Sequence, residues 1–107
     1  MSRVAVLGER DAVLGFRSSG AVVFCADSPD EAKDALAGVL KEDFAILLVT
    51  EWVAEALKAE LAPLYEQPKP VVTVLPDARG AGGQAMEILR KRVERAVGAN
   101  ILLKREE

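Results

Sequence analysis

The side chains best placed for chemistry follow two hydrophobic segments. Glu9 and Asp11 come directly after the apolar residues 3–8, and Thr50 follows residues 44–49. If these segments are parallel strands, their carboxyl ends meet at the edge where open α/β sheets bind ligands. An acidic pair at the first end holds magnesium in receiver domains, which also need a phosphate-accepting aspartate after the third strand. Because the hydroxyl of Thr50 cannot replace that carboxylate, we expect an edge without catalytic groups and predict that Asp11 caps the following helix.

A glycine-rich segment, Arg79-Gly80-Ala81-Gly82-Gly83, precedes the last predicted helix. Backbone amides at a helix start can bind an anion, but a P-loop ends in lysine and serine or threonine. Gln84-Ala85 stands there instead. We therefore predict a flexible linker over 79–83. A small enzyme that uses Asp77 and Arg79 stays a weaker alternative, because no nucleophile–base pair accompanies them.

The composition excludes several classes of site. The chain has 107 residues and no histidine, which removes Ser-His-Asp and Cys-His catalysis and the usual zinc sites. Its single cysteine, Cys25, rules out an internal disulfide and fits a reducing cytoplasm. A net charge of −3 argues against nucleic acid as a partner, and no apolar run approaches the ~20 residues of a membrane span. We predict no catalytic residue, cofactor or metal, and favour a binding or assembly subunit.

Hydrophobic periodicity predicts alternating strands and helices. Near-continuous apolar runs such as 3–8 and 44–49 suit strands covered on both faces. Ser28-Pro29-Asp30-Glu31 combines an N-cap, a proline at the first helical position and a capping-box glutamate. We expect an α/β fold: a small Rossmann-like, receiver-like three-layer sandwich with a four-stranded parallel sheet ordered 2-1-3-4 and a C-terminal helix. Its parts are a core over 1–78, the linker over 79–83, and the helix and apolar tail over 84–107, all in one domain.

The last helix carries basic residues and is followed by an apolar tail. We predict a helix from about Gln84 to Val97 that ends at Gly98, before Ile101-Leu102-Leu103. The tail either folds back on the domain or is completed by another chain. Arg90-Lys91-Arg92 and Arg95 form either a solvated face, with Glu87 pairing along the helix, or a docking strip for an acidic partner.

These segments resemble the F subunit of V-type/A-type ATP synthases. Val4 to Arg17 matches the opening of that family, with its Gly15-Phe16-Arg17 element followed by Gly20. The resemblance continues through the capped second helix, the turn at Thr50-Glu51 and a proline-flanked fourth strand. It closes with Arg95-Ala96-Val97-Gly98 and the apolar tail, and so covers essentially the whole chain.

The resemblance implies a non-catalytic central-stalk subunit. Such a protein binds the coiled coil of the D subunit, and the pair forms the rotor that turns inside the A/B catalytic hexamer. It also implies indirect contact with the membrane-side stalk subunit and a cytoplasmic location, peripheral to the membrane. The residues expected to bind the D subunit are Arg90, Arg95, Ile101 and Leu103, with Phe16 and Arg17 as weaker candidates. A degenerate receiver-like or nucleotide-sensing regulatory domain, using Glu9, Asp11 and Thr50, is the alternative from another class.

Overall fold

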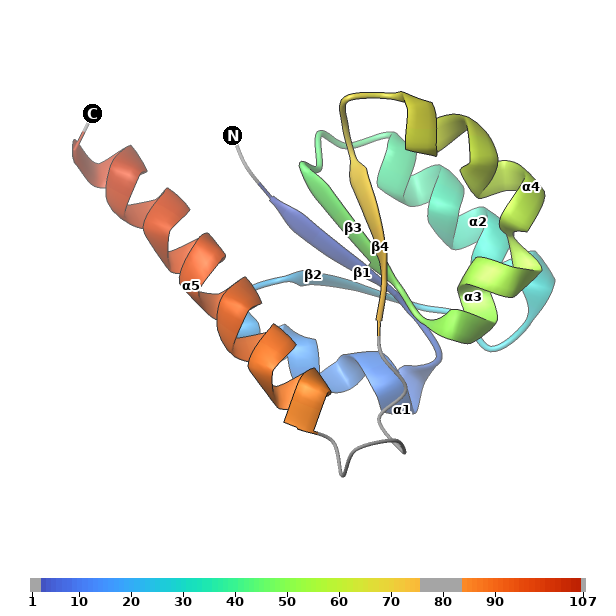
Figure 1. Cartoon of the computed structure of the whole chain (residues 1–107), viewed down its shortest axis with the longest axis horizontal. Coiled ribbons are helices and arrows are strands. Elements are labelled where there is room, and N and C mark those ends of the chain that lie inside the picture. Colours follow the sequence, from blue (N-terminus) through green and yellow to red (C-terminus); the bar gives the residue numbers. More distant parts are fainter. Residues whose placement is uncertain (1–2, 76–83, 107) are drawn as a thin grey trace.

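Four parallel strands form the centre of the molecule (Figure 1). The computed structural model describes the backbone of residues 3–75 and 84–106 and the side chains of 3–75 and 87–98. The strands are β1 (Val4–Gly8), β2 (Val22–Cys25), β3 (Ile46–Val49) and β4 (Val71–Val74). Their order is β2-β1-β3-β4, and all three pairings are parallel. The predicted α/β fold and strand order are confirmed.

Helical segments cover both faces of this sheet (Figure 1). One face carries α2 (Pro29–Leu40), α3 (Glu51–Ala56), α4 (Lys58–Leu61) and the 3-10 helix η2 (Ala62–Glu66). The other carries α1 (Arg10–Val13), the 3-10 helix η1 (Leu14–Ser19) and the long helix α5 (Gln84–Glu106).

Alternate residues along each strand supply two separate hydrophobic cores. Successive side chains of a strand point to opposite faces, so Ala5 and Leu7 join the core beneath α2 and α3. Val4 and Val6 join the core beneath η1 and α5, together with Leu48 of β3. This double burial explains why the strands are continuous apolar runs rather than alternating ones.

The capping box of α2 forms as predicted. The Ser28 hydroxyl accepts a hydrogen bond from the backbone N–H of Glu31 at 3.2 Å. The Glu31 carboxylate reaches back and accepts from the backbone N–H of Asp27 at 3.1 Å. Pro29 occupies the first helical position, where the missing N–H costs nothing. The start of α2 is therefore fixed by local sequence.

The predicted cap at Asp11 and the predicted helix end at Gly98 are wrong. Asp11 lies inside α1, because the backbone carbonyl of Glu9 already accepts from the N–H groups of Ala12 and Val13. The helix after Thr50 is interrupted at Leu57, which separates α3 from α4. Gly98 does not end the last helix, since α5 runs through it to Glu106.

Candidate partner-binding surface on the last helix

At the carboxyl edge of the sheet, the side chains of Glu9 and Thr50 bind each other. Thr50 holds the N-cap position of α3, but its hydroxyl donates to the Glu9 carboxylate at 2.7 Å instead of capping the helix. Gly8 ends β1 so close to Thr50 that a Cβ there would stand 2.3 Å from the threonine methyl group. Asp11 is exposed on α1 and outside this pair. The edge thus pairs Glu9 with Thr50, and Asp11 takes no part in their hydrogen bond.

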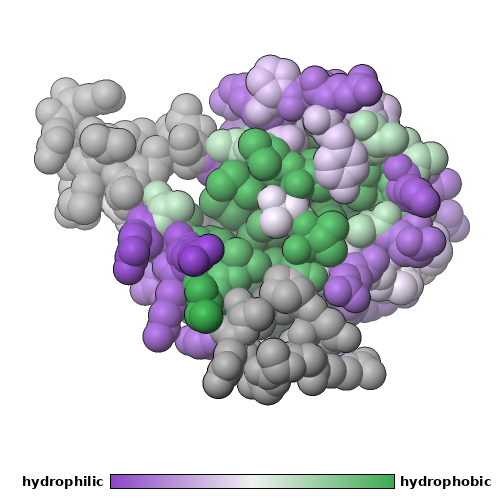
Figure 2. Space-filling view, in the orientation of Figure 1, coloured by the Kyte–Doolittle hydropathy of each residue, from purple (hydrophilic) through white to green (hydrophobic). Residues whose placement is uncertain are grey.

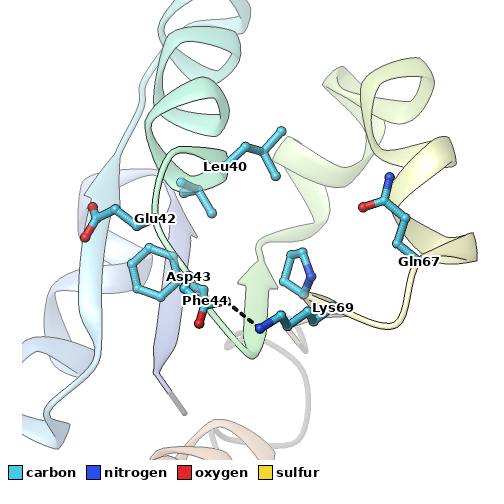
Figure 3. A pocket seen from close by; sticks show the side chains of 8 residues that line it. Leu40, Glu42, Asp43, Phe44, Gln67 and Lys69 are labelled. Carbon is cyan, nitrogen blue, oxygen red and sulfur yellow. Dashed lines mark ion pairs between the residues drawn. The ribbon is translucent and has the colours of Figure 1, made fainter. Parts of the chain in front are cut away.

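A small cavity opens at the opposite end of the sheet, before β3 and β4 (Figure 3). Its volume is about 150 Å³, with Phe44 and Leu40 among its apolar lining residues. Lys69 and Asp43 form an ion pair of 2.7 Å at its rim, and this contact lowers the pKa of Asp43 through a hydrogen bond and the lysine charge. Within the part of the chain that the structure describes, no group of three His, Cys, Asp or Glu residues could hold a metal ion.

Helix α5 packs on η1 through one apolar seam. Val93 is buried in the core of that face, with Leu89 and Val97 partly buried beside it. These three apolar residues of α5 face the domain, whereas Ala96 is exposed and the side chain of Met86 lies outside the described residues. The seam fixes which side of α5 is hidden.

Two glycines at the ends of η1 allow the helix to approach closely. A Cβ on Gly15 would lie 2.9 Å from an Nη atom of Arg90, and a Cβ on Gly20 would lie 2.8 Å from a methyl group of Val97. Arg90 and Val97 are seven residues apart, close to two helical turns, so they share one side of α5. Gly20 also has φ of 90°, and this left-handed conformation ends η1.

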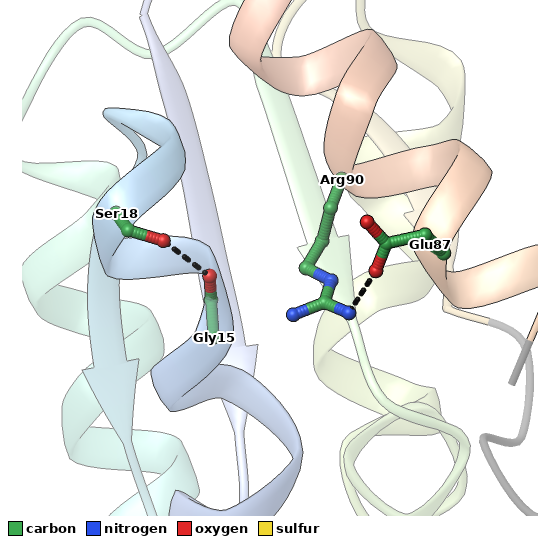
Figure 4. Close-up of polar contacts among 4 residues, drawn as sticks. All are labelled: Gly15, Ser18, Glu87 and Arg90. Carbon is green, nitrogen blue, oxygen red and sulfur yellow. Dashed lines mark hydrogen bonds and ion pairs between the residues drawn. The ribbon is translucent and has the colours of Figure 1, made fainter.

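The Arg90 side chain extends from α5 toward η1 and is partly buried there, with 37% of its surface exposed (Figure 4). Its Nη2 donates to the Glu87 carboxylate one turn earlier on the helix. Across the seam, Ser18 donates to the carbonyl of Gly15 at 3.1 Å. The Nε–H of Arg90 is buried without a hydrogen-bond partner among the described residues. A buried donor without a partner costs free energy, so this contact holds α5 less firmly than an apolar side chain would.

The remaining predicted interface residues fall into three situations. Arg17 and Arg95 are exposed, on η1 and α5 respectively. Phe16 is fully buried, as its apolar character favours, and lies in the core beneath α5. Ile101 and Leu103 belong to the backbone of α5, but their side chains lie outside the described residues, as do Asp77, Arg79 and the predicted linker 79–83.

The basic residues of α5 could be predicted from the sequence, but the close contacts between η1 and α5 could not. The only signal for them was the spacing of Gly15 and Gly20 around Phe16. Neither glycine indicated which segment it would meet, because Arg90 and Val97 lie far along the chain.

Comparisons with known proteins agree with this architecture. The profile of the family "ATP synthase (F/14-kDa) subunit" matches residues 4–93. The F subunit of a V-type ATP synthase of Clostridium botulinum (strain Eklund 17B / Type B) is 33% identical over 100 residues, which cover 94% of this chain and 97% of that protein. The F subunit of an A-type ATP synthase of Methanothermobacter thermautotrophicus is 28% identical over 103 residues, which cover 94% of this chain and 97% of that protein.

A solved structure supports the fold alone. The crystal structure of the F subunit of the V-type ATP synthase of Archaeoglobus fulgidus superposes with a TM-score of 0.57 at 21% identity. The match covers 70% of this chain and 98% of that chain. In the described part of the present chain, no helix combines the length and the apolar character that crossing a membrane requires.

Proposed function

Because this chain belongs to the family of the ATP synthase (F/14-kDa) subunit, we propose that it is a non-catalytic component of the central stalk of a V/A-type ATP synthase. It binds the coiled coil of the D subunit through α5 and helps to couple ATP hydrolysis or synthesis to ion translocation. Contacts with the A/B catalytic hexamer and with the membrane-side stalk subunit are indirect. The complex holds it at the cytoplasmic surface of the membrane.

The observation that carries this proposal is the exposure of α5. Helix α5 has 23 residues, but Val93 is the only buried side chain among its described positions 87–98. Its C-terminal half extends away from the sheet (Figure 1). A helix that contacts its own domain along so little of its surface leaves the rest free for a second chain.

The exposed charges of α5 favour a partner with acidic side chains. Lys91, Arg92 and Arg95 are exposed, although the whole chain carries a net charge of −3. Such a local concentration of positive charge orients an acidic partner and accelerates association more than it adds affinity. Arg95 thus remains a proposed interface residue, and Ile101 and Leu103 would supply the apolar contact farther along the helix.

Co-expression with the D subunit of the same organism tests the proposal. We expect a stable one-to-one complex when the mixture is analysed by size-exclusion chromatography with light scattering. A chain that remains monomeric beside a folded D subunit would contradict it.

Deletion of residues 99–107 tests the role of α5 directly. The truncation removes Ile101 and Leu103 and leaves every described core residue in place. We expect the dissociation constant for the D subunit to rise about tenfold or more, because a few apolar anchors carry most of an interface's affinity. Circular dichroism and thermal melting should show that the domain stays folded, and an unchanged dissociation constant would remove the deleted end of α5 from the interface.

A further inference from the structure

Helices cover only part of the sheet face that lies beneath α5. The part formed by β3 and β4 is uncovered. Parallel registration places Val71 beside Ile46 and Thr73 beside Leu48, so these residues point to the same face as Val4 and Val6. Val71 is 55% exposed, Thr73 is exposed and Ile46 is partly buried. Figure 2, which views the molecule with β4 in front, shows an apolar area at its centre, around one residue of intermediate hydropathy. We call Ile46, Val71 and Thr73 the open strip.

The open strip has the width of one helix. Neighbouring strands lie about 4.8 Å apart, so β3 and β4 together span roughly 10 Å. This equals the diameter of an α-helix with its side chains. On the opposite face of the same two strands, Leu47, Val49 and Val72 pack with α3, α4 and η2, and Val74 at the end of β4 is exposed. Parallel sheets occur almost only with helices on both faces, so the open strip lacks the helix that such a sheet requires.

The side of α5 next to the open strip carries apolar and basic side chains. With about 3.6 residues per turn, one flank of the buried seam carries Glu87, Arg90 and Glu94, and this is the flank that meets η1. The opposite flank carries Ile88, Arg92 and Ala96, and Arg95 lies with Lys91 on the outer side of the helix. All three residues of this flank are exposed, Ile88 by 53%. The described part of this flank therefore presents positive charge and no carboxylate to a neighbour.

We propose that the open strip binds one amphipathic helix of the rotor partner. Its apolar stripe lies on Ile46, Val71 and Thr73, and its acidic flank faces Arg92. The inference rests on the proposed function, since the helix comes from the chain that α5 binds, and it adds a second contact surface on the sheet itself. A helix of this chemistry satisfies both the uncovered apolar area and the one-sided charge of α5.

The apolar contact is tested with a matched pair of substitutions on β4. Val71→Asp places a charge on the open strip. Val74→Asp places the same charge on the opposite face of the same strand, where Val74 is 42% exposed. Measured by calorimetry with the D subunit, we expect Val71→Asp to weaken binding about tenfold or more and Val74→Asp to change it less than about twofold. Equal affinities of the two variants would overturn the inference.

The charge contact is tested with a second matched pair on α5. Arg92→Glu reverses a charge beside the open strip, whereas Lys91→Glu reverses one on the outer side of the helix. We expect the first to slow association more than the second and to flatten its dependence on salt. Identical association rates for both variants would contradict the acidic flank of the partner.

The same experiments separate this inference from the proposed function. If deletion of residues 99–107 weakens the complex and Val71→Asp does not, α5 binds the D subunit and the open strip does not. If the wild-type chain forms no complex, both proposals fail. Light scattering of the isolated chain tests whether a second copy of the chain occupies the open strip. A dimer that Val71→Asp converts to a monomer would show a contact between two copies there and would overturn the inference. Thermal melting of each variant controls for folding.

Discussion

Gly15 and Gly20 meet α5 at opposite ends of η1, but the obstacle at each position is different. At Gly20 a new methyl group would press on the branched Val97, and φ of 90° is itself unfavourable for any side chain. At Gly15 the obstacle is the mobile end of Arg90. We expect Gly20→Ala to lower the free energy of unfolding by about 2–3 kcal/mol and Gly15→Ala by less than about 1 kcal/mol. Urea denaturation measures both, and equal losses would contradict this account.

Asp43 makes the electrostatic contact whose pH dependence is easiest to follow. The hydrogen bond and charge of Lys69 lower the pKa of Asp43 in the folded protein. The stability from this contact is therefore complete above the pKa of the unfolded chain, about 3.9, and disappears as the pH falls through the lower folded value. We expect Lys69→Met to raise the pKa of Asp43 in a carboxyl NMR titration while stability at pH 7 hardly changes, because the pair is exposed. A pKa of Asp43 unaffected by Lys69→Met would show that the pair does not persist in solution.

Among the elements, those fixed by neighbouring residues could be predicted, and those fixed by distant contacts could not. The start of α2 follows from Ser28, Pro29 and Glu31 alone. The position of α1 depends on the backbone of Glu9, whose side chain is held by Thr50 at the N-cap of α3. Helix α5 continues through Gly98 because a glycine costs only about 1 kcal/mol there, and helix-forming Ala99, Leu102 and Leu103 follow. A left-handed stop needs contacts that the sequence does not reveal.

The residues of the candidate site also divide into those that the sequence could predict and those that it could not. Arg95 and the neighbouring cations of α5 could be read from the sequence as a possible docking strip, because helical spacing alone places them on the surface. The partial burial of Arg90 and the exposure of Val71 could not. Both depend on where α5 crosses the sheet, and this position is set by its contacts with Gly15 and Gly20. The apolar run of β4 is typical of a strand covered on both faces, whereas the structure leaves Val71 and Thr73 exposed.

At the scale of the whole molecule, the two cores depend differently on α5. The core beneath α2, α3 and α4 contains no residue of α5. The other core receives Val93 from it, with Leu89 and Val97 packed alongside. We therefore expect residues 1–78 to fold without the rest of the chain, as the predicted core boundary implies, and to lose about 2–4 kcal/mol of stability from the apolar surface that α5 no longer covers.

The measurement is urea unfolding of the 1–78 fragment beside the intact chain, followed by far-ultraviolet and near-ultraviolet circular dichroism. One cooperative transition at lower urea, with near-ultraviolet signal retained, is the expected result. A fragment that keeps helical signal but loses cooperativity would mean that α5 is an obligatory part of the second core. In that case α5 could not give up its contacts with η1 for a partner, and the D subunit would have to bind it in place. The stability of the fragment therefore decides how α5 can reach another chain.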